Sequence, residues 1–202
     1  MTEIVRRKEM GRMTREEWLA RAVNLVAPHF MTTAGIDIPD VRVSVGWPGG
    51  RGKKNNVIGQ CWSGNAAADG VAQIFISPTI GDPVQVLGTL IHEIVHAAVG
   101  TEHGHKAPFA KVAKAVGLTG KMTSTTVGPE LQGMLEDRIV PVLGDYPHAI
   151  LTPAMAGVKK QTTRMLKVEC PDTGYTARLT RKWIEEWGTP ICPCCNEQME
   201  MG

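Results

Sequence analysis

The sequence predicts an α+β protein in which helices surround a small sheet, followed by a separate small cysteine-rich β module. Three observations support this fold class. Helical patterns and a short β-rich stretch follow one another in residues 1–143. Residues 144–163 are rich in Pro, Gly, Thr and Lys without a clear period, which indicates a linker. Four of the five cysteines lie in the last 33 residues, so we expect a small third segment over 164–202.

Composition excludes several classes of protein. A chain of 202 residues, 43% hydrophobic and 21% charged, can bury one good core plus an appendage. The net charge of +2 is too small to indicate nucleic acid by itself, although basic clusters occur at 6–8, 51–54 and 159–160. We see no apolar leader and no bilayer-length apolar run, so we expect a cytoplasmic protein without a membrane partner. Thiols stay reduced there, and clustered cysteines then favour metal over disulfides.

The first predicted elements are one helix and three strands. Thr14 with Glu17 forms a capping-box pattern, and the apolar residues that follow predict a helix that ends before Pro28. Short β-rich stretches then predict strands, and the glycine- and lysine-rich stretch between the first two is expected to be an exposed basic hairpin loop. The strands are expected at 41–47, 59–64 and 71–77, and the loop at 49–56.

Three further helices are predicted after the strands. Asp82 is a good N-cap, Pro83 suits the first helical position and Gly100 the stop, which predicts a helix over 83–99. A second helix is expected to begin after His105 and to end at Gly117. A third helix is expected over about 129–143, where Gly133 and Pro141 lower the helix propensity.

The helix over 83–99 carries the pattern His92-Glu93-x-x-His96. The two histidines are four residues apart, so both imidazoles can reach a single ion from one helix face. Buried imidazoles and a carboxylate are unfavourable unless something pairs with them. The pattern therefore predicts a zinc site with Glu93 as a general base beside the metal rather than a ligand, and zinc then requires a third protein ligand.

Several residues are candidates for this third ligand. The metzincin pattern HExxHxxGxxH would place histidine at 102, but this chain has Glu102, with His103 one residue later. A one-residue shift rotates a helical ligand by about 100°. A glutamate from a later helix, Glu130 or Glu136, is another option but has no supporting motif.

The arrangement resembles the SprT-like metalloproteases, the family that includes Spartan. Their pattern is HExxH, a short loop, and then a histidine with an aromatic residue four positions later; His105 and Phe109 fit it, with Lys106 in place of the usual glycine. The resemblance implies a zincin-like core in which His92, His96 and His105 hold catalytic zinc, with His103 as the reserve ligand. The order of elements and the segments at 117–123 and 146–148 look like SprT-like proteins of phage and prophage origin, which implies the host cytoplasm.

The C-terminal segment is laid out like a zinc ribbon, in which two CxxC turns supply four thiolates. Cys192 and Cys195 form the second turn, but the first turn has Cys170 with Thr173 in the place of its second cysteine. Three outcomes are open: Cys194 becomes the fourth ligand, Asp172 contributes an oxygen, or the ribbon holds metal weakly or not at all. A small packed hairpin with free thiols, built around aromatic side chains, is the alternative without metal; these are Tyr175, Trp183 and Trp187.

Three hypotheses for function follow. The first is a zinc-dependent SprT-like endopeptidase, for which the resemblance implies substrates that are proteins associated with DNA. The second is a regulatory metallopeptidase that cleaves a repressor. The third is a non-catalytic, zinc-stabilised nucleic-acid-binding or transcription-associated protein, which predicts a closed four-ligand site joined by His103 or Glu102. Basic stretches at 51–54 and 159–167 are compatible with DNA as a partner.

Overall fold

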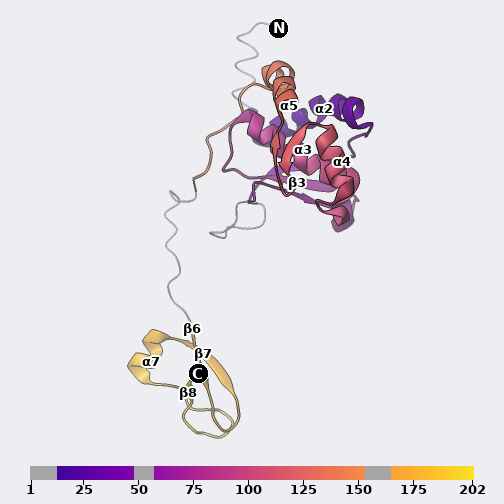
Figure 1. The fold of residues 1–202 in the computed structure, drawn as a ribbon. Helices are drawn as coiled ribbons and strands as arrows, with labels where there is room; N and C mark the ends of the chain where they lie inside the picture. Colours follow the sequence, from indigo (N-terminus) through magenta and orange to yellow (C-terminus); the bar gives the residue numbers. More distant parts are fainter. Residues whose placement is uncertain (1–12, 48–56, 153–164) are drawn as a thin grey trace. The chain divides into compact units, whose positions relative to one another are not determined.

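The computed structural model describes residues 13–47, 57–152 and 165–202. The chain divides into two compact units, Met1–Pro153 and Ala154–Gly202, each with its own buried cluster (Figure 1). Both units mix helices with small sheets, which confirms the α+β class. The predicted basic hairpin loop and most of the predicted linker lie outside the described residues.

The order of elements in the first unit follows the predicted one, with an additional hairpin. The elements are α2 (Arg15–Ala34), β1 (Val41–Val45), β2 (Gly59–Trp62), β3 (Ala72–Ile76), α3 (Pro83–Val99), α4 (Ala107–Ala115), β4 (Leu118–Lys121), β5 (Ser124–Val127), α5 (Pro129–Met134), the π-helical segment Leu135–Ile139 and α6 (Val140–Leu143). Short 3-10 turns lie at Gly64–Ala66 and Thr101–His103.

Helix α2 begins as predicted but continues beyond the predicted end. Thr14 and Glu17 form both hydrogen bonds of the capping box. The expected stop before Pro28 is wrong, because the helix contains Pro28 and ends at Ala34, with Gly35 as its C-cap. The reason is that its buried face continues to Phe30, which is fully buried, so packing offsets the backbone hydrogen bond that proline cannot donate.

The three predicted strands are confirmed, but their pairing differs from a simple hairpin. The strand order is β1-β3-β2, with β3 parallel to β1 and antiparallel to β2. The expected hairpin between the first two strands is therefore wrong. Strand β3 takes the centre because its alternate residues Ala72, Ile74 and Ile76 are all buried against the core.

Helix α3 forms the centre of the first unit, with helices around it in Figure 1. It has the predicted bounds: Asp82 caps it through a hydrogen bond from the Gln85 backbone N–H, and it ends before Gly100. Its apolar side packs into the main core, and the side chains that are fully buried there are Val86, Leu87, Leu90, Ile91, Ile94 and Val95. The remaining stripe of α3 carries the HExxH residues.

The hairpin of β4 and β5 and the last helical stretch complete the first unit. The hairpin was not among the predicted elements. Helix α4 has the predicted apolar face and lies between His105 and Gly117. The helical stretch 129–143 is confirmed, but its middle is π-helical, and it precedes Pro141, which cannot donate a backbone hydrogen bond.

Residues 144–152, expected to belong to the linker, pack instead on the first unit. Tyr146 is buried and contacts the Trp18 ring edge-on, with ring centroids 5.0 Å apart. The buried Arg15 guanidinium donates hydrogen bonds to the carbonyls of Pro147 and Ala149, at 2.9 and 2.8 Å. The boundary expected at 143 is therefore wrong. The ring contact of Tyr146 and the hydrogen bonds to backbone carbonyls do not require a helical or strand period, so the missing period gave no signal for them.

The second unit contains a three-stranded sheet and one short helix. The elements are β6 (Met165–Glu169), β7 (Thr176–Thr180), α7 (Arg181–Trp187) and β8 (Glu200–Met201), with strand order β7-β6-β8. Among its described residues 165–202, the buried side chains are those of Val168, Cys170, Cys192 and Met199. The alternative core of Tyr175, Trp183 and Trp187 is wrong, because these three side chains are exposed.

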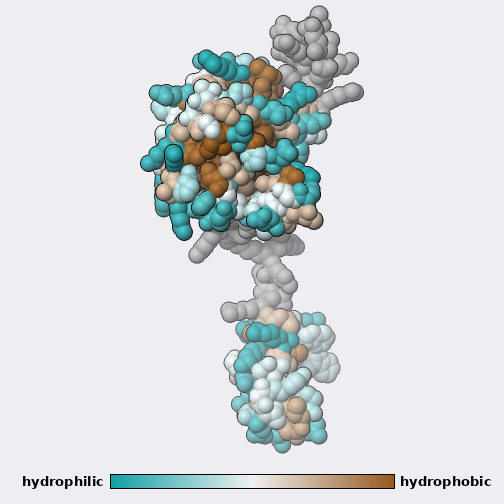
Figure 2. All heavy atoms as spheres, turned by 90° about the vertical axis from the view of Figure 1, so that its right-hand side faces the viewer, coloured by the Kyte–Doolittle hydropathy of each residue, from teal (hydrophilic) through white to brown (hydrophobic). Residues whose placement is uncertain are grey.

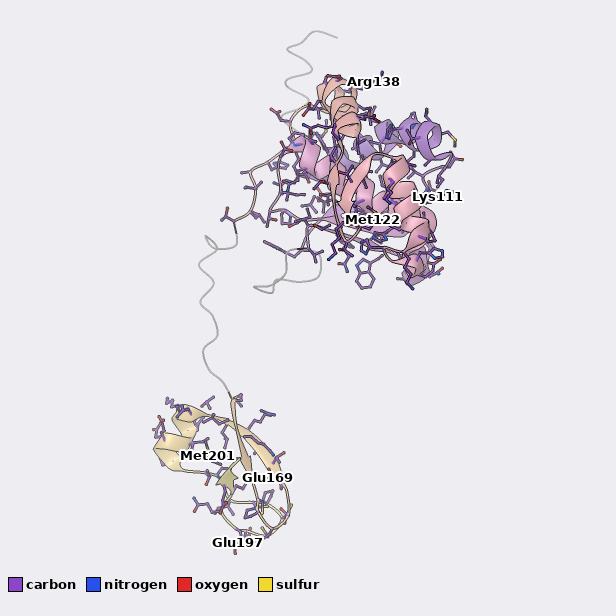
Figure 3. All side chains as sticks on the ribbon, viewed as in Figure 1. Lys111, Met122, Arg138, Glu169, Glu197 and Met201 are labelled. Carbon is purple, nitrogen blue, oxygen red and sulfur yellow. The ribbon has the colours of Figure 1, made fainter. Side chains whose placement is uncertain are left out.

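The surface is mostly hydrophilic on the face of the first unit shown in Figure 2, with apolar side chains gathered in a few places. Lys111 on α4 and Arg138 on the π-helical segment, labelled in Figure 3, are exposed. Met122, at the turn between β4 and β5, packs instead against the main core. Within the described ranges, no helix is both long enough and apolar enough to cross a bilayer.

Candidate functional site

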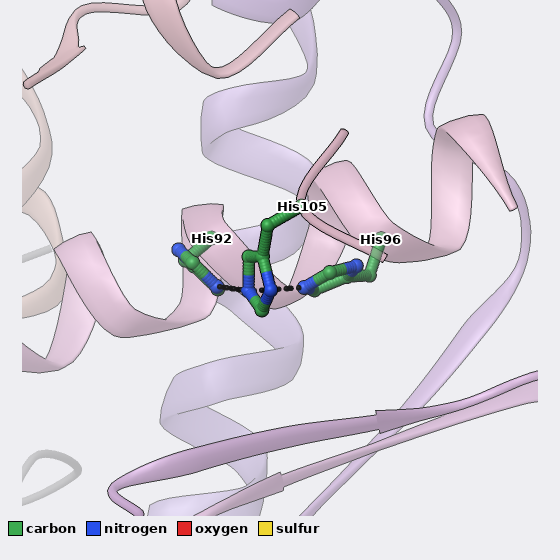
Figure 4. A group of neighbouring side chains, drawn as sticks. All are labelled: His92, His96 and His105. Carbon is green, nitrogen blue, oxygen red and sulfur yellow. Dashed lines mark hydrogen bonds between the residues drawn. The ribbon is translucent and has the colours of Figure 1, made fainter. Parts of the chain in front are cut away.

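Three histidines come together on one side of α3. His92 and His96 project from successive turns of the helix, and His105 reaches them from the segment just before α4 (Figure 4). The Nε2 atom of His105 lies 3.2 Å from the Nε2 atoms of both His92 and His96. Tetrahedral zinc with nitrogen ligands at about 2.05 Å would hold these atoms about 3.3 Å apart. The spacing therefore fits a metal ion bound by three imidazoles.

The other candidates for the third ligand do not join this cluster. His103 is 44% exposed at its side chain and lies 3.7 Å from Glu102, which is also exposed. In the described part of the chain, the three histidines form a metal-compatible group without a fourth His, Cys, Asp or Glu. Glu130 and Glu136 are exposed on the helical stretch 129–143 and are not in the group either. The structure thus brings together the three residues expected from motif spacing.

The histidine cluster opens into a cleft of about 680 Å³. One wall comes from β2 and the residues just before it, and another from the β4–β5 hairpin. The three rings also contact Phe109 of α4, whose centroid lies 4.3 Å from that of His96. An open side of this kind leaves room for a water molecule and a substrate beside the cluster, as catalytic rather than closed structural sites require.

Burial keeps the imidazoles of the cluster neutral. Loss of solvation, reinforced by the neighbouring histidines, lowers the pKa of His92 and His96 to about 4. Loss of solvation also lowers the pKa of His105. Neutral imidazole is the form that binds metal, so the cluster is ready to bind an ion near neutral pH without first releasing protons.

Glu93 lies next to the cluster but is not part of it. Its side chain is 6% exposed, and burial raises its pKa to about 8, partly offset by a hydrogen bond from the Cys61 backbone N–H. Gly59 is needed here, since a Cβ atom at 59 would lie 2.5 Å from Glu93 Oε1. Strand β2 therefore fixes the carboxyl group from one side. Cys61 packs against the core and also lines the cleft, and burial raises the pKa of its thiol to about 12.

Thr125 on β5 belongs to the histidine site, although the sequence alone did not indicate this. Its hydroxyl lies 2.8 Å from Nδ1 of His92. If His92 donates this hydrogen bond, its Nε2 lone pair faces the other two imidazoles, as a metal ligand requires. The hairpin can approach α3 this closely because Gly88 has no side chain, and Val127 occupies the space beside it. The stretch 123–127, in which four of the five residues are β-branched, is followed by Gly128 and was the available signal for this strand.

Replacing Thr125 with valine is expected to weaken metal binding about 10- to 100-fold, because the outer hydrogen bond that orients His92 is lost while side-chain volume is kept. Competition with a chelator would measure this change. Thr126→Val is the matched control, since the Thr126 hydroxyl contacts Thr119 on the same hairpin. Thr125→Ser should restore most of the affinity. Equal loss in the Thr125 and Thr126 variants would contradict a role in orienting the ligand.

In the metal-free protein, we expect the titration of His92, His96 and Glu93 together to make the free energy of unfolding largest near pH 6.5. As pH falls from 6.5 to 4, unfolded chains bind protons on His92 and His96 that folded chains exclude, so stability decreases. As pH rises from 4.5 to 8, Glu93 retains a proton only in the folded state, so stability also decreases. Between pH 6.5 and 8 the Glu93 effect is about 2 kcal/mol.

Urea unfolding of the metal-free chain at pH 5, 6.5 and 8, followed by helical circular dichroism, would check this expectation. Glu93→Gln supplies the control, because glutamine cannot ionise. Its stability should stay level between pH 6.5 and 8. A decrease in that variant equal to the one in the parent chain would contradict the assignment to Glu93.

The second unit contains a group of three thiols. Cys170, Cys192 and Cys195 place their sulfur atoms within 4.8 Å of one another, and the Cys170 and Cys195 sulfurs are 3.4 Å apart. Four-coordinate zinc with sulfur ligands at about 2.3 Å separates them by about 3.8 Å, so this group also fits a metal ion. A hydrogen bond from the Thr173 hydroxyl, with others from backbone N–H groups, lowers the pKa of Cys192 to about 6. Cys194 is exposed and lies outside the group.

Both clusters can therefore bind a metal ion, and the first adds a buried carboxyl group beside an open cleft. Comparisons with protein-family models, with curated proteins and with solved structures find no match to this chain. The function must therefore be inferred from the chemistry of the two clusters.

Proposed function

We propose that the chain is a zinc-dependent endopeptidase of the SprT-like type, with a zincin-like first unit and a ribbon-like second unit. The observation that carries this proposal is the set of three convergent imidazoles with a buried glutamate beside them in an open cleft. A purely structural ion needs no accessible cleft and no buried carboxyl group beside it. This favours an enzyme over the zinc-stabilised, non-catalytic alternative.

His92, His96 and His105 would hold the zinc ion through their Nε2 atoms. When bound, zinc supplies Lewis acidity that polarises the scissile carbonyl and makes a water molecule more acidic. Glu93 accepts a proton from the attacking water and donates it to the leaving amine. Its carboxyl group suits both roles, because burial places its pKa near neutrality and the Cys61 N–H and Gly59 hold it in position.

We propose proteins associated with DNA as the substrates. This part of the proposal rests on the family resemblance and on exposed side chains of the second unit. Arg178 and Lys182 are exposed there, as are Trp183 and Trp187, and such basic and aromatic groups can contact nucleic acid. The basic clusters at 6–8, 51–54 and 159–160 lie outside the described residues.

Removal of metal is expected to abolish proteolysis reversibly. The experiment incubates the full chain with an unfolded protein and with a DNA-binding protein, each with and without DNA, and follows cleavage by gel electrophoresis. A chelator should stop cleavage, and one equivalent of added zinc per histidine site should restore it. Faster cleavage of the DNA-binding protein in the presence of DNA would support the substrate class. A zinc-loaded chain that cleaves neither protein under any of these conditions would contradict the proposal.

A further inference from the structure

Two turns in the second unit have the same backbone geometry, although only one has a complete CxxC pattern. In the first turn the carbonyl of Cys170 accepts a hydrogen bond from Gly174 N–H at 2.9 Å. In the second, the carbonyl of Cys192 accepts one from Asn196 N–H, also at 2.9 Å. Gly174 and Asn196 both have positive φ, 67° and 62°. Asparagine tolerates this conformation better than most residues with a side chain, so the same turn forms at both sites.

The correspondence extends to the next hydrogen bond. Cys170 N–H donates to the carbonyl of Tyr175 at 2.9 Å, and Cys192 N–H donates to that of Glu197 at 2.7 Å. Each cysteine therefore begins a turn closed by the same pair of backbone hydrogen bonds. With Cys170 matched to Cys192 and Gly174 matched to Asn196, the residue that matches Cys195 is Thr173.

The side-chain contacts follow the same relation. Cys195 Sγ lies 3.4 Å from Cys170 Sγ, which begins the other turn. Thr173 Oγ1 lies 3.4 Å from Cys192 Sγ, which likewise begins the other turn. Three thiols and one hydroxyl thus occupy the four positions that the two turns direct toward a common centre.

The same correspondence excludes two other candidates for the fourth position. Cys194 matches Asp172, and both precede the inward-facing residue of their turn. Both side chains belong to exposed residues. Neither residue is in the group of converging metal-ligand atoms, which contains only Cys170, Cys192 and Cys195 in this part of the described chain.

We propose that the second unit binds zinc through the thiolates of Cys170, Cys192 and Cys195, and that the fourth position, beside Thr173, is open to an exchangeable small ligand. A neutral hydroxyl is a much weaker zinc ligand than a thiolate, so a water molecule, an imidazole or a small thiol can take this position. Thr173 is exposed, which gives such a ligand access. This site is separate from the histidine cluster, so it is independent of the proposed protease activity.

Cobalt binding to the full chain would test this proposal. His92→Ala and His96→Ala are included in every variant, so that cobalt is bound only in the second unit. Thr173→Cys should complete a four-thiolate site. It should raise the thiolate-to-cobalt absorption by about one third, as three sulfur ligands become four, and increase resistance to a chelator at least about tenfold. Cys194→Ser should leave the absorption and the resistance unchanged.

A second measurement uses the same proteins. Added imidazole should shift the visible cobalt bands when Thr173 is present and should leave them unchanged in the Thr173→Cys variant. Three results would overturn the proposal: no thiolate-to-cobalt absorption with Thr173 present, loss of about one quarter of it in Cys194→Ser as four sulfur ligands become three, or no response to imidazole in either protein. The second of these would identify Cys194 as the fourth ligand.

Discussion

Glu93→Gln is expected to reduce peptide-bond cleavage by at least about 10²- to 10⁴-fold, the contribution typical of a positioned general acid–base. Glutamine keeps the size of the side chain and its contact with Gly59, but it cannot accept a proton from water. Metal binding should be unchanged, because Glu93 does not belong to the group of three histidines. The measurement pairs initial cleavage rates with zinc content of the same preparation.

Glu102→Gln is the matched control for this substitution. Glu102 lies between the HExxH helix and His105, but its side chain is 70% exposed and pairs with His103. Its variant should cleave at the parent rate. If Glu93→Gln kept full activity, or lost activity only together with its zinc, the assigned role of Glu93 would be wrong.

His105→Ala is expected to remove one zinc per chain, whereas His103→Ala should remove none. His105 Nε2 contacts both other imidazoles, and its loss leaves two ligands where zinc requires at least three. The zinc affinity should fall by more than in the Thr125 variant. Loss of an outer hydrogen bond such as that of Thr125 is expected to weaken binding about 10- to 100-fold. His103 instead lies near Glu102 on the surface.

Elemental analysis of the two variants, with the parent chain beside them, would decide between these histidines. Because we propose that the thiol cluster binds zinc as well, the zinc content of each variant is compared with that of the parent chain. A decrease of one zinc in His103→Ala, with parent content in His105→Ala, would reverse the assignment of the third ligand. Circular dichroism of each variant would show whether the helices are retained.

Much of the local structure could be predicted from sequence, because local signals determine it. The cap at Asp82 and the stop at Gly100 defined α3, and the four-residue spacing of His92 and His96 placed both on one face. The resemblance to the SprT-like pattern, which His105 and Phe109 fit, then implied the third member of the cluster. These features depend on residues close together in the chain, where capping, periodicity and motif spacing are informative.

The remaining features depend on contacts between distant residues. Nothing near Thr125 or Gly59 in the sequence indicates that they contact His92 and Glu93, since those contacts require β5 and β2 to pack on α3. The parallel pairing of β1 with β3 is likewise set by which strand is buried on the core. Pro28 shows that packing can also override a local helix-breaking signal.

The two units differ greatly in how much apolar surface they bury, and this has a consequence for the protein under zinc starvation. The first unit has a large apolar cluster, so it should remain folded when its histidines hold no ion. Among the described residues of the second unit only four side chains are buried in its core, and two of them, Cys170 and Cys192, belong to the group that could hold a metal ion. With zinc bound there as proposed, the metal would supply much of the folding free energy of this unit. When zinc becomes scarce, we expect cellular proteases to clip this end of the chain first, so that a shortened form accumulates and reports the zinc supply of the cell.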